Sequence, residues 1–449
     1  MNGNCLPALV LRSGLCLLLA LPLAGCGVYD SVFGDAEQER LEGTRIPVLG
    51  GDRGLTADPA VAGTAVQVPP PVAIFDWPQT GVTPGHVAGS LAGPSSLDPV
   101  WQVSAGDGGG STTPFLSQPV IVGDRIFVKD GESGVHALSR STGATIWSAD
   151  LTPEGEQSET GFGGGLAHDA GRLFVTTPFG FVAALDPQTG GELWRSSVGV
   201  PMRGAPAAAG GRVFAVTHDN QLYALDQSTG AVIWSYRAIV EPAGLLKAGV
   251  PALRGDLVAA PFGSGELVGL RPANGAVLWG DTLARTGLVT PLAALSAVAG
   301  APVIEGDRVY AISHGGRFVA LDALSGRRIW TIDVAGTEMP WSAGDYLFAV
   351  TTQAQVLAVR KGDGRIRWVS ALPAFEDPED REDPIFWSGP VLAGGQLVLV
   401  GSHGRLVALS PSDGSIVREA DAPDAYLAPV VAGDTLYVLG RDGTLAAYR

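Results

Sequence analysis

The chain has 449 residues, of which 46% are hydrophobic and only 16% are charged. Its 45 acidic and 29 basic side chains give a formal net charge of −16, which argues against a nucleic-acid partner because phosphate binding requires clustered Lys and Arg. All three cysteines lie at or before residue 26. The rest of the chain therefore contains no disulfide framework, cysteine nucleophile or cysteine-based metal site.

The amino terminus has the layout of a secretory signal. An apolar run from Leu15 to Leu23 is too short to cross a bilayer and ends in small residues before Cys26. The sequence LAGC over residues 23–26 resembles the lipobox of bacterial lipoproteins. The resemblance implies that residues 1–25 are a signal peptide, that Cys26 is acylated, and that Gly27 directs the protein to the outer membrane. Several acyl chains on one residue give a stable anchor. The alternative is an ordinary cleaved signal with an incidental cysteine.

Residues 26–94 are predicted to be a lipidated Cys followed by a tether. This part of the chain mixes charges, contains three consecutive prolines at residues 69–71 and shows no sustained apolar period. Two short segments, residues 45–49 and the stretch around Ile74 to Trp77, are apolar enough to dock on the folded body.

From about residue 95 the chain repeats one unit. Each unit has two short apolar runs joined by Gly-Asp or Gly-Gly, a strong hairpin signal, then an alternating run and a turn of the form (T/N/S/D)GxxxW. Four short strands per unit of about 44 residues are typical of a β-propeller blade. The turn motif ends at Trp147, Trp194, Trp234, Trp279, Trp330 and Trp368, and a seventh copy carries Arg418 instead.

Eight units can be counted, and the last supplies only three strands before Arg449. The strand around Trp101 is the candidate for the missing fourth strand, and its pairing would close the ring without a free edge. We therefore predict an all-β, eight-bladed propeller over residues 95–449, with small apolar inner strands and tryptophans as core residues between blades. An open solenoid is the alternative. The units begin near Pro119, Ala167, Pro206, Pro251, Pro302, Met339, Pro390 and Pro429.

Two resemblances bear on function. The blade signature ALDxxTGxxxW, present as ALDPQTGGELW and ALDQSTGAVIW, resembles the repeat of pyrroloquinoline quinone (PQQ) dehydrogenase propellers. A lipobox followed by eight such blades resembles the BamB family, the lipoprotein subunits of the outer-membrane β-barrel assembly machinery. The BamB resemblance implies a non-catalytic scaffold that faces the periplasm and binds the periplasmic domains of the barrel-forming, BamA-like subunit.

Two other functions are compatible with the repeat. A PQQ-dependent quinoprotein dehydrogenase would be expected to carry an axial Asp base, Glu and Asn calcium ligands and often a vicinal Cys pair. This chain lacks the Cys pair and the long insertions that would cover a cofactor, and it has no EF-hand type loop, so we predict no cofactor, metal or catalytic residue. No Ser-His-Asp arrangement or phosphate-binding loop is recognisable either. The second alternative is a periplasmic propeller that binds another protein partner.

A long connection from Leu283 to Pro302 is the candidate partner-binding loop. Many aliphatic residues in one surface connection favour an interface, although the loop could instead pack as a short helix on its own blade. Enteric family members carry an Arg and two acidic residues in the equivalent loop, where this chain has Ala297 and Ala299, so the enteric salt bridges are not carried over. The candidate contact residues are Arg285, Leu288, Val289, Leu292 and Leu295.

A second long connection has six carboxylates between Glu376 and Asp383. A charge run of this kind predicts a solvated face, with contact to a basic partner as the alternative. Three histidines, His218, His314 and His403, recur at one repeat position, where the polarity of blade turns accounts for them.

Overall fold

A computed structural model describes residues 54–109, 114–241, 245–284 and 296–449. Cys26 and residues 45–49 lie outside the described residues. Residues Thr56–Arg449 form one compact unit. Within the described residues, no helix has the length and apolar character needed to cross a membrane.

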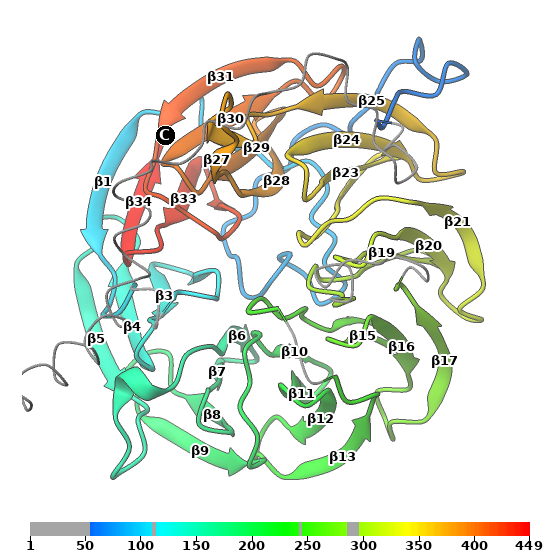
Figure 1. Ribbon diagram of the computed structural model, residues 1–449. Coiled ribbons are helices and arrows are strands. Elements are labelled where there is room, and N and C mark those ends of the chain that lie inside the picture. Colours follow the sequence, from blue (N-terminus) through cyan, green and yellow to red (C-terminus); the bar gives the residue numbers. More distant parts are fainter. Residues whose placement is uncertain (1–53, 110–113, 242–244, 285–295) are drawn as a thin grey trace, which may run out of the picture. The chain divides into compact units, whose positions relative to one another are not determined.

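Eight four-stranded antiparallel sheets follow one another around a ring (Figure 1). In each of the first seven, the strands run in chain order from the inner to the outer edge. Blades one to three are β2 (Val120–Val122), β3 (Arg125–Lys129), β4 (Gly134–Ser139) and β5 (Thr145–Asp150); β6 (Gly165–Asp169), β7 (Arg172–Thr176), β8 (Phe181–Leu185) and β9 (Glu192–Ser197); and β10 (Ala207–Ala209), β11 (Arg212–Val216), β12 (Gln221–Asp226) and β13 (Val232–Arg237). The 3₁₀ turn η1 (Ser158–Thr160) lies between the first two.

The next four blades repeat this arrangement. They are β14 (Ala252–Arg254), β15 (Leu257–Pro261), β16 (Glu266–Leu270) and β17 (Val277–Thr282); β18 (Val303–Glu305), β19 (Arg308–Ile312), β20 (Phe318–Asp322) and β21 (Arg328–Ile332); β22 (Trp341–Ala343), β23 (Tyr346–Val350), β24 (Gln355–Arg360) and β25 (Ile366–Ala371); and β28 (Trp387–Ala393), β29 (Gln396–Gly401), β30 (Arg405–Leu409) and β31 (Ile416–Asp421). A separate hairpin, β26 (Phe375–Asp377) and β27 (Glu382–Pro384), lies between blades six and seven.

The eighth blade closes the ring with strands from both ends of the propeller sequence. It contains β32 (Val430–Ala432), β33 (Thr435–Leu439) and β34 (Thr444–Tyr448), and its outer strand is β1 (Pro99–Ser104). Trp101 lies opposite Ala447, and Asp98 and Arg449 exchange two backbone hydrogen bonds of 3.3 and 3.0 Å. The predictions of eight blades and of closure by the strand around Trp101 are therefore confirmed.

The repeated tryptophans join neighbouring blades. Each indole N–H donates to a backbone carbonyl in the turn before the outer strand of the next blade, and the ring lies against the glycine of that turn. Gly230, for example, has a φ of +74°, and a Cβ there would lie 2.5 Å from the Trp194 ring. Trp279, Trp330 and Trp368 are buried, and Trp147, Trp194 and Trp234 are partly buried and pack against the core, so their predicted role between blades is confirmed. The bonds are Trp147 to Pro187 (3.2 Å), Trp194 to Gln227 (3.1 Å), and Trp234 to Pro272, Trp279 to Ala323, Trp330 to Lys361 and Trp368 to Pro411 (2.9 Å each).

The one departure from the motif falls at the seam between blades seven and eight. In blade eight the strands β34 and β1 come from opposite ends of the propeller sequence, so no turn joins them. The turn carbonyl that accepts the indole N–H in the other blades is therefore missing. Arg418, at the tryptophan position, instead donates to the carbonyl of Ser95 at 3.1 Å. The longer side chain therefore reaches the incoming segment that completes the ring.

A β-bulge recurs where the third and fourth strands pair. The register shifts at the same repeat position in blades one to seven, for example between Ala224 and Leu225 in blade three. A bulge bends the strand and increases its twist. The bulge comes directly before the turn that receives the neighbouring tryptophan.

Candidate binding face and hub

The segment Ile74–Leu91, called here the hub strap, runs around the axis of the ring and contacts every blade. It appears in blue across the centre of Figure 1. Its residues meet blade eight and then blades one to seven, in chain order. The bonds are Gly433 N to Ile74 O (2.6 Å), Ile121 N to Trp77 O (2.9 Å), His168 N to Pro78 O (2.7 Å), Ala208 N to Gln79 Oε1 (3.1 Å), Leu253 N to Pro84 O (2.7 Å), Ile304 N to Gly85 O (2.9 Å), Trp341 Nε1 to Gly89 O (2.8 Å) and Leu91 N to Leu392 O (3.0 Å). The stretch around Ile74 to Trp77, which the sequence marks as apolar enough to dock, is thus docked on the ring.

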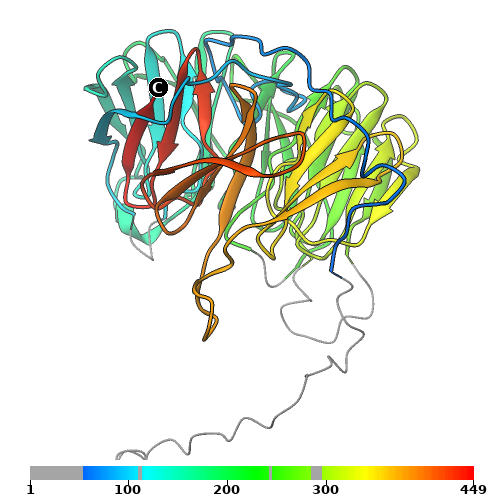
Figure 2. The ribbon, with the colours of Figure 1, turned by 90° about the horizontal axis from the view of Figure 1, so that it is seen from above.

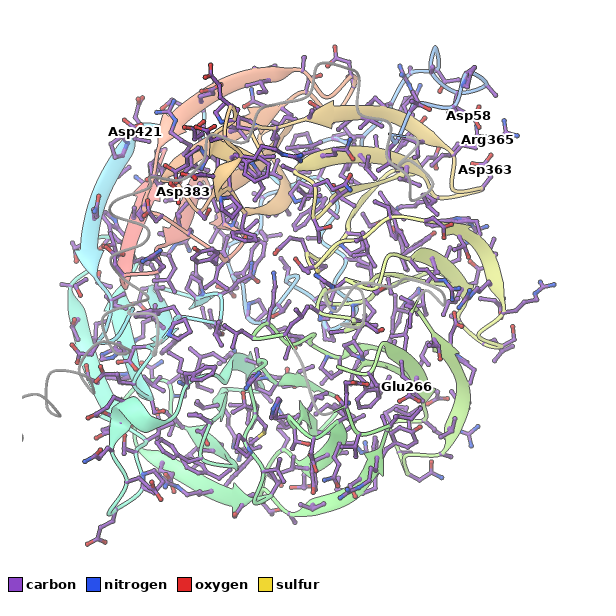
Figure 3. The ribbon with its side chains drawn as sticks, viewed as in Figure 1. Asp58, Glu266, Asp363, Arg365, Asp383 and Asp421 are labelled. Carbon is purple, nitrogen blue, oxygen red and sulfur yellow. The ribbon has the colours of Figure 1, made fainter. Side chains whose placement is uncertain are left out.

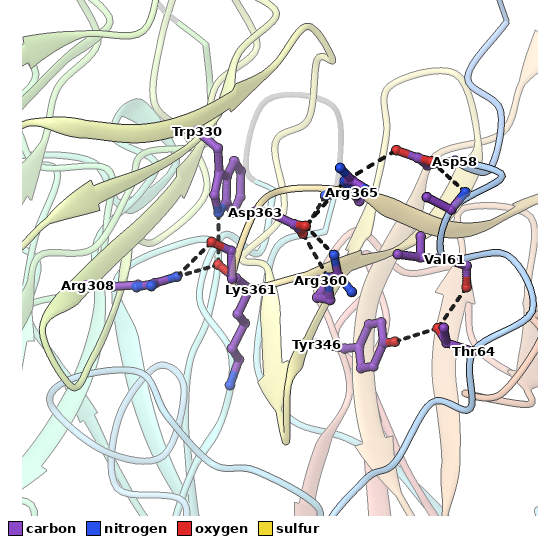
Figure 4. Close-up of polar contacts among 12 residues, drawn as sticks. Asp58, Val61, Thr64, Arg308, Trp330, Tyr346, Arg360, Lys361, Asp363 and Arg365 are labelled. Carbon is purple, nitrogen blue, oxygen red and sulfur yellow. Dashed lines mark hydrogen bonds and ion pairs between the residues drawn. The ribbon is translucent and has the colours of Figure 1, made fainter.

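The chain preceding the hub strap crosses the rim at blade six (Figure 4). Asp58 lies 3.6 Å from the Arg365 guanidinium and donates its backbone N–H to Ile366. Further along, the Thr64 hydroxyl lies 3.5 Å from the Tyr346 hydroxyl. Figure 3 shows Asp58, Asp363 and Arg365 together at this edge of the ring. The segment thus enters the hub from a fixed point on blade six.

The interior of the hub is filled by the chain's own side chains. Trp77 of the hub strap is 1% exposed and stacks on Trp341 with ring centroids 6.3 Å apart. Lys247 and Glu338 form an ion pair, and together with Trp77 and Trp341 they line a cavity of about 80 Å³. Ligand and cofactor pockets usually occupy about 300–1,000 Å³, so this cavity is too small for a three-ring quinone. Within the described residues, no group of three or more His, Cys, Asp or Glu side chains is placed to hold a metal ion.

The long connections lie on the face opposite the hub strap. Because the strands of a blade alternate in direction, every connection from an outer strand to the next inner strand leaves by one face. The hub strap bonds instead near the other ends of the inner strands. In Figure 2 the hairpin β26–β27 projects from the face of these connections. This face is therefore the one that is free to present loops.

The connection between β13 and β14 exposes large apolar side chains. Ile239, Val240 and Leu246 are 64%, 57% and 52% exposed. The Glu266 carboxylate, labelled in Figure 3, accepts a 2.8 Å hydrogen bond from the Ile239 backbone N–H and so fixes this connection to blade four. An exposed apolar cluster held on a rigid scaffold is typical of a protein-binding surface. The sequence analysis did not single out this connection.

The predicted partner-binding residues Arg285, Leu288, Val289, Leu292 and Leu295 lie outside the described residues. The described end of their connection contains Ala297 and Ala299, which are 4% and 2% exposed. These two alanines are core residues here and present nothing to a partner.

The acidic connection forms the hairpin β26–β27, whose strand residues are exposed except for the half-buried Phe375. Figure 3 labels Asp383 there. The Arg381 guanidinium lies 5.4 Å from the centroid of the Phe375 ring. The hairpin is joined to blade seven by the Trp387 indole, which donates to Pro373 O at 2.8 Å. Its run of carboxylates is solvated, as predicted.

Three titratable or nucleophilic side chains meet in blade one, which the sequence analysis did not recognise. His136 Nε2 lies 2.7 Å from Asp130 Oδ2, and His136 Nδ1 lies 2.9 Å from Ser148 Oγ. Asp130 also accepts backbone N–H groups of its own turn, including that of Gly134 at 2.7 Å. Burial raises the pKa of Asp130, but hydrogen bonding to His136 and to the backbone N–H of Asp107 outweighs it, so the pKa is lowered. Ser148 is exposed on the outer strand, so these three residues do not line a pocket. Their hydrogen bonds stabilise the turn between β3 and β4.

Two of the recurring histidines, His218 and His314, occupy equivalent backbone positions. In blade seven the equivalent position is Ser402, whose N–H donates to Phe386 O at 2.9 Å, and His403 follows it, so the predicted common repeat position is wrong for His403. The His218 N–H donates to Pro201 O at 2.8 Å and the His314 N–H to Ala297 O at 3.0 Å, so both tie a turn to the preceding connection. Burial lowers the pKa of His218 and of His403. The three histidines belong to different blades and form no shared cluster within the described residues.

These features define a closed, eight-bladed propeller built from PQQ-like repeats, with a filled hub and a loop-bearing face. The family model described as outer membrane protein assembly factor BamB matches residues 97–158, 131–370 and 377–449. The chain belongs to this family.

Individual relatives agree with the family match. The chain is 29% identical to outer membrane protein assembly factor BamB of Salmonella typhimurium over 353 residues, which is 78% of this chain and 88% of the relative. The crystal structure of BamB from Moraxella catarrhalis superposes with a TM-score of 0.66 at 18% identity, covering 79% of this chain and 99% of that one. A quinohemoprotein alcohol dehydrogenase from Comamonas testosteroni gives 0.63 at 15% identity, covering 83% and 80%. The two structural likenesses establish the fold alone.

Proposed function

We propose that the protein is a non-catalytic scaffold lipoprotein of the outer-membrane β-barrel assembly complex. The observation that carries the proposal is the match to the BamB family over nearly the whole propeller. The packing of Trp77 against Trp341 supports it, because the cavity that these two rings line, of about 80 Å³, is too small for a quinone.

The proposed partner is the barrel-forming, BamA-like subunit, bound through its periplasmic domains. Its binding site is the face with the long connections, where Ile239, Val240 and Leu246 are exposed. The contact residues predicted from the sequence, Arg285, Leu288, Val289, Leu292 and Leu295, are proposed to contribute as well. A closed ring keeps these loops ordered before binding, which reduces the conformational entropy lost on association.

We propose an outer-membrane location facing the periplasm, with the protein anchored by lipid on Cys26 after removal of residues 1–25. The chain after Cys26 leads to the docked segment that starts at Thr56. Attachment to the membrane raises the effective concentration of the binding face near the membrane-embedded partner. Replacing Cys26 with Ala should release the protein from outer-membrane fractions.

Affinity purification of the native lipoprotein from outer membranes tests the partner. Replacing Ile239 and Leu246 with Asp, or Leu288 and Leu292 with Asp, should reduce recovery of the barrel-forming subunit about tenfold, the effect typical of losing an interface anchor. Leu193→Asp is the matched control, because Leu193 is a 50% exposed leucine on an outer strand. Unchanged recovery in both double variants would remove this face from the interface.

A further inference from the structure

We propose that the inner-strand edges around the hub form a binding surface for polypeptide backbone, which the hub strap occupies in cis and can vacate. The partner that fits this surface in trans is an unfolded polypeptide segment with a large aromatic side chain.

The surface exists because each inner strand pairs with its blade on one side only. The sheets of the first seven blades begin with the inner strand and the sheet of blade eight ends with it, so one edge of each inner strand faces the axis. Unpaired strand edges readily accept another chain. At blade one the pairing is reciprocal, with Trp77 N to Ile121 O at 2.7 Å and the return bond at 2.9 Å. At blade seven Leu91 receives and donates in the same way, through Leu392 O and Gly394 N.

Most of these contacts are hydrogen bonds to the backbone of the hub strap rather than to its side chains. The carbonyls of Ile74, Pro78, Pro84, Gly85 and Gly89 all accept hydrogen bonds from the ring. Any polypeptide offers such carbonyls, so the surface is tolerant of sequence.

Two side chains add selectivity. Gln79 makes two bonds to the backbone of Ala208, at 3.1 and 3.3 Å. Trp77 fills the hub against Trp341. The aromatic position is therefore the one that a substitute segment must match.

The hub strap is docked at an energetic cost. Val82 and His86 have φ values of +72° and +60°, a region that is unfavourable for residues with a Cβ and most of all for a β-branched one. Three buried polar atoms of the hub strap, Trp77 Nε1, His86 Nε2 and Ser90 Oγ, have no hydrogen-bond partner within the described chain. Backbone strain and buried unsatisfied polar groups reduce the free energy that holds such a segment in place. The hub strap is thus placed to leave while the ring stays folded.

Hydrogen exchange on the full-length lipoprotein in detergent tests whether the hub strap opens. The amides of Trp77, Leu91, Ile121 and Gly394 should exchange together and about tenfold or more faster than those of β33 and β34. Trp77→Ala should accelerate this exchange further, whereas Leu193→Ala, at an exposed position on the outer strand of blade two, should not. Exchange of the hub strap only through global unfolding would overturn the proposal.

A biotinylated peptide of residues 70–94 tests the surface in trans. The Trp77→Ala protein, once its circular dichroism is shown to match the wild type, should capture one peptide per chain. The wild type should capture far less, because the tethered segment competes at high effective concentration. A peptide of scrambled sequence should be captured about tenfold less than the native one, since it misplaces the aromatic anchor. A folded variant that captures neither peptide, or both equally, would contradict the proposal.

Discussion

The indole of Trp330 in blade five donates a hydrogen bond to the backbone carbonyl of Lys361 in blade six, 2.9 Å away (Figure 4). The same ring lies against Gly364, whose φ is +75° and whose added Cβ would come within 2.8 Å of the indole. The (T/N/S/D)GxxxW motif therefore describes two halves of one contact, with the glycine of one blade receiving the tryptophan of the blade before it.

This contact predicts that the motif glycines tolerate no side chain. Gly230→Ala should lower the free energy of unfolding by about 2–4 kcal/mol, because the new methyl group meets the Trp194 ring at 2.5 Å and the residue keeps a strained φ. Gly211→Ala is the matched control, with a φ of +77° and nothing within 4 Å. It should cost only about 1 kcal/mol for the backbone. Denaturant titration measures both, and equal losses would refute the packing explanation.

The ring seam gives a second prediction. Arg418→Ala should speed amide exchange in residues 96–104 and in β34, because it removes the bond to Ser95 at 3.1 Å. Arg418→Trp should not restore slow exchange, since no turn receives an indole there. Slow exchange in Arg418→Trp together with fast exchange in Arg418→Ala would contradict this explanation. It would show that the volume of the side chain, rather than its hydrogen bond to Ser95, stabilises the seam.

His86 predicts how stability depends on pH. Burial lowers the pKa of His86 from 6.5 to about 4, while its hydrogen bond to Pro302 opposes the shift. The folded state therefore keeps this imidazole neutral, whereas the unfolded state takes up a proton below pH 6.5. The stability present above pH 6.5 should fall as pH drops towards 4 and then level off, by about 3 kcal/mol in total.

The His86→Gln variant isolates this effect from the carboxylates, which also titrate in acid. The difference in unfolding free energy between wild type and His86→Gln, measured from pH 7.5 to 4, should change in the stated direction. A difference that stays constant with pH would show that His86 does not titrate as described.

The proposed lack of catalysis is tested by adding the cofactor of the alternative function. We expect no dye-linked oxidation of alcohols or glucose when the purified protein is incubated with PQQ and calcium, because the cavity lined by Trp77 and Trp341 is about 80 Å³ and cofactor pockets are several times larger. Sustained turnover above that of free PQQ would reverse the functional assignment.

The sequence predicted the blades because their signals reside in side chains. Gly-Asp turns, small inner strands and regularly spaced tryptophans located all eight blades and the closing strand around Trp101. In the hub strap, only the stretch around Ile74 to Trp77 could be marked from the sequence. The later contacts, such as those of Pro84 and Gly85, are made by backbone carbonyls, which every residue has and which the sequence therefore does not distinguish. The same limit applies to the recurrent bulge. The role of Arg418 depends on the missing turn between β34 and β1 in blade eight. That gap is visible only once the ring is closed in the structure.

The exposed connection at Ile239 to Leu246 was missed for another reason. Its exposed apolar residues are few and are separated by charged and small residues, so no run of aliphatic residues marks them in the sequence. The trio of Asp130, His136 and Ser148 spans a turn and two strands and becomes visible only through their pairing.

Photocrosslinking in living cells tests the central claim most directly. A photoreactive phenylalanine analogue at position 246, on the exposed connection, should yield a covalent adduct with the barrel-forming subunit. The same analogue at position 193, on an outer strand, should yield none. Adducts at position 193 but not at 246, or no adduct with that subunit from any residue of the loop-bearing face, would contradict the account.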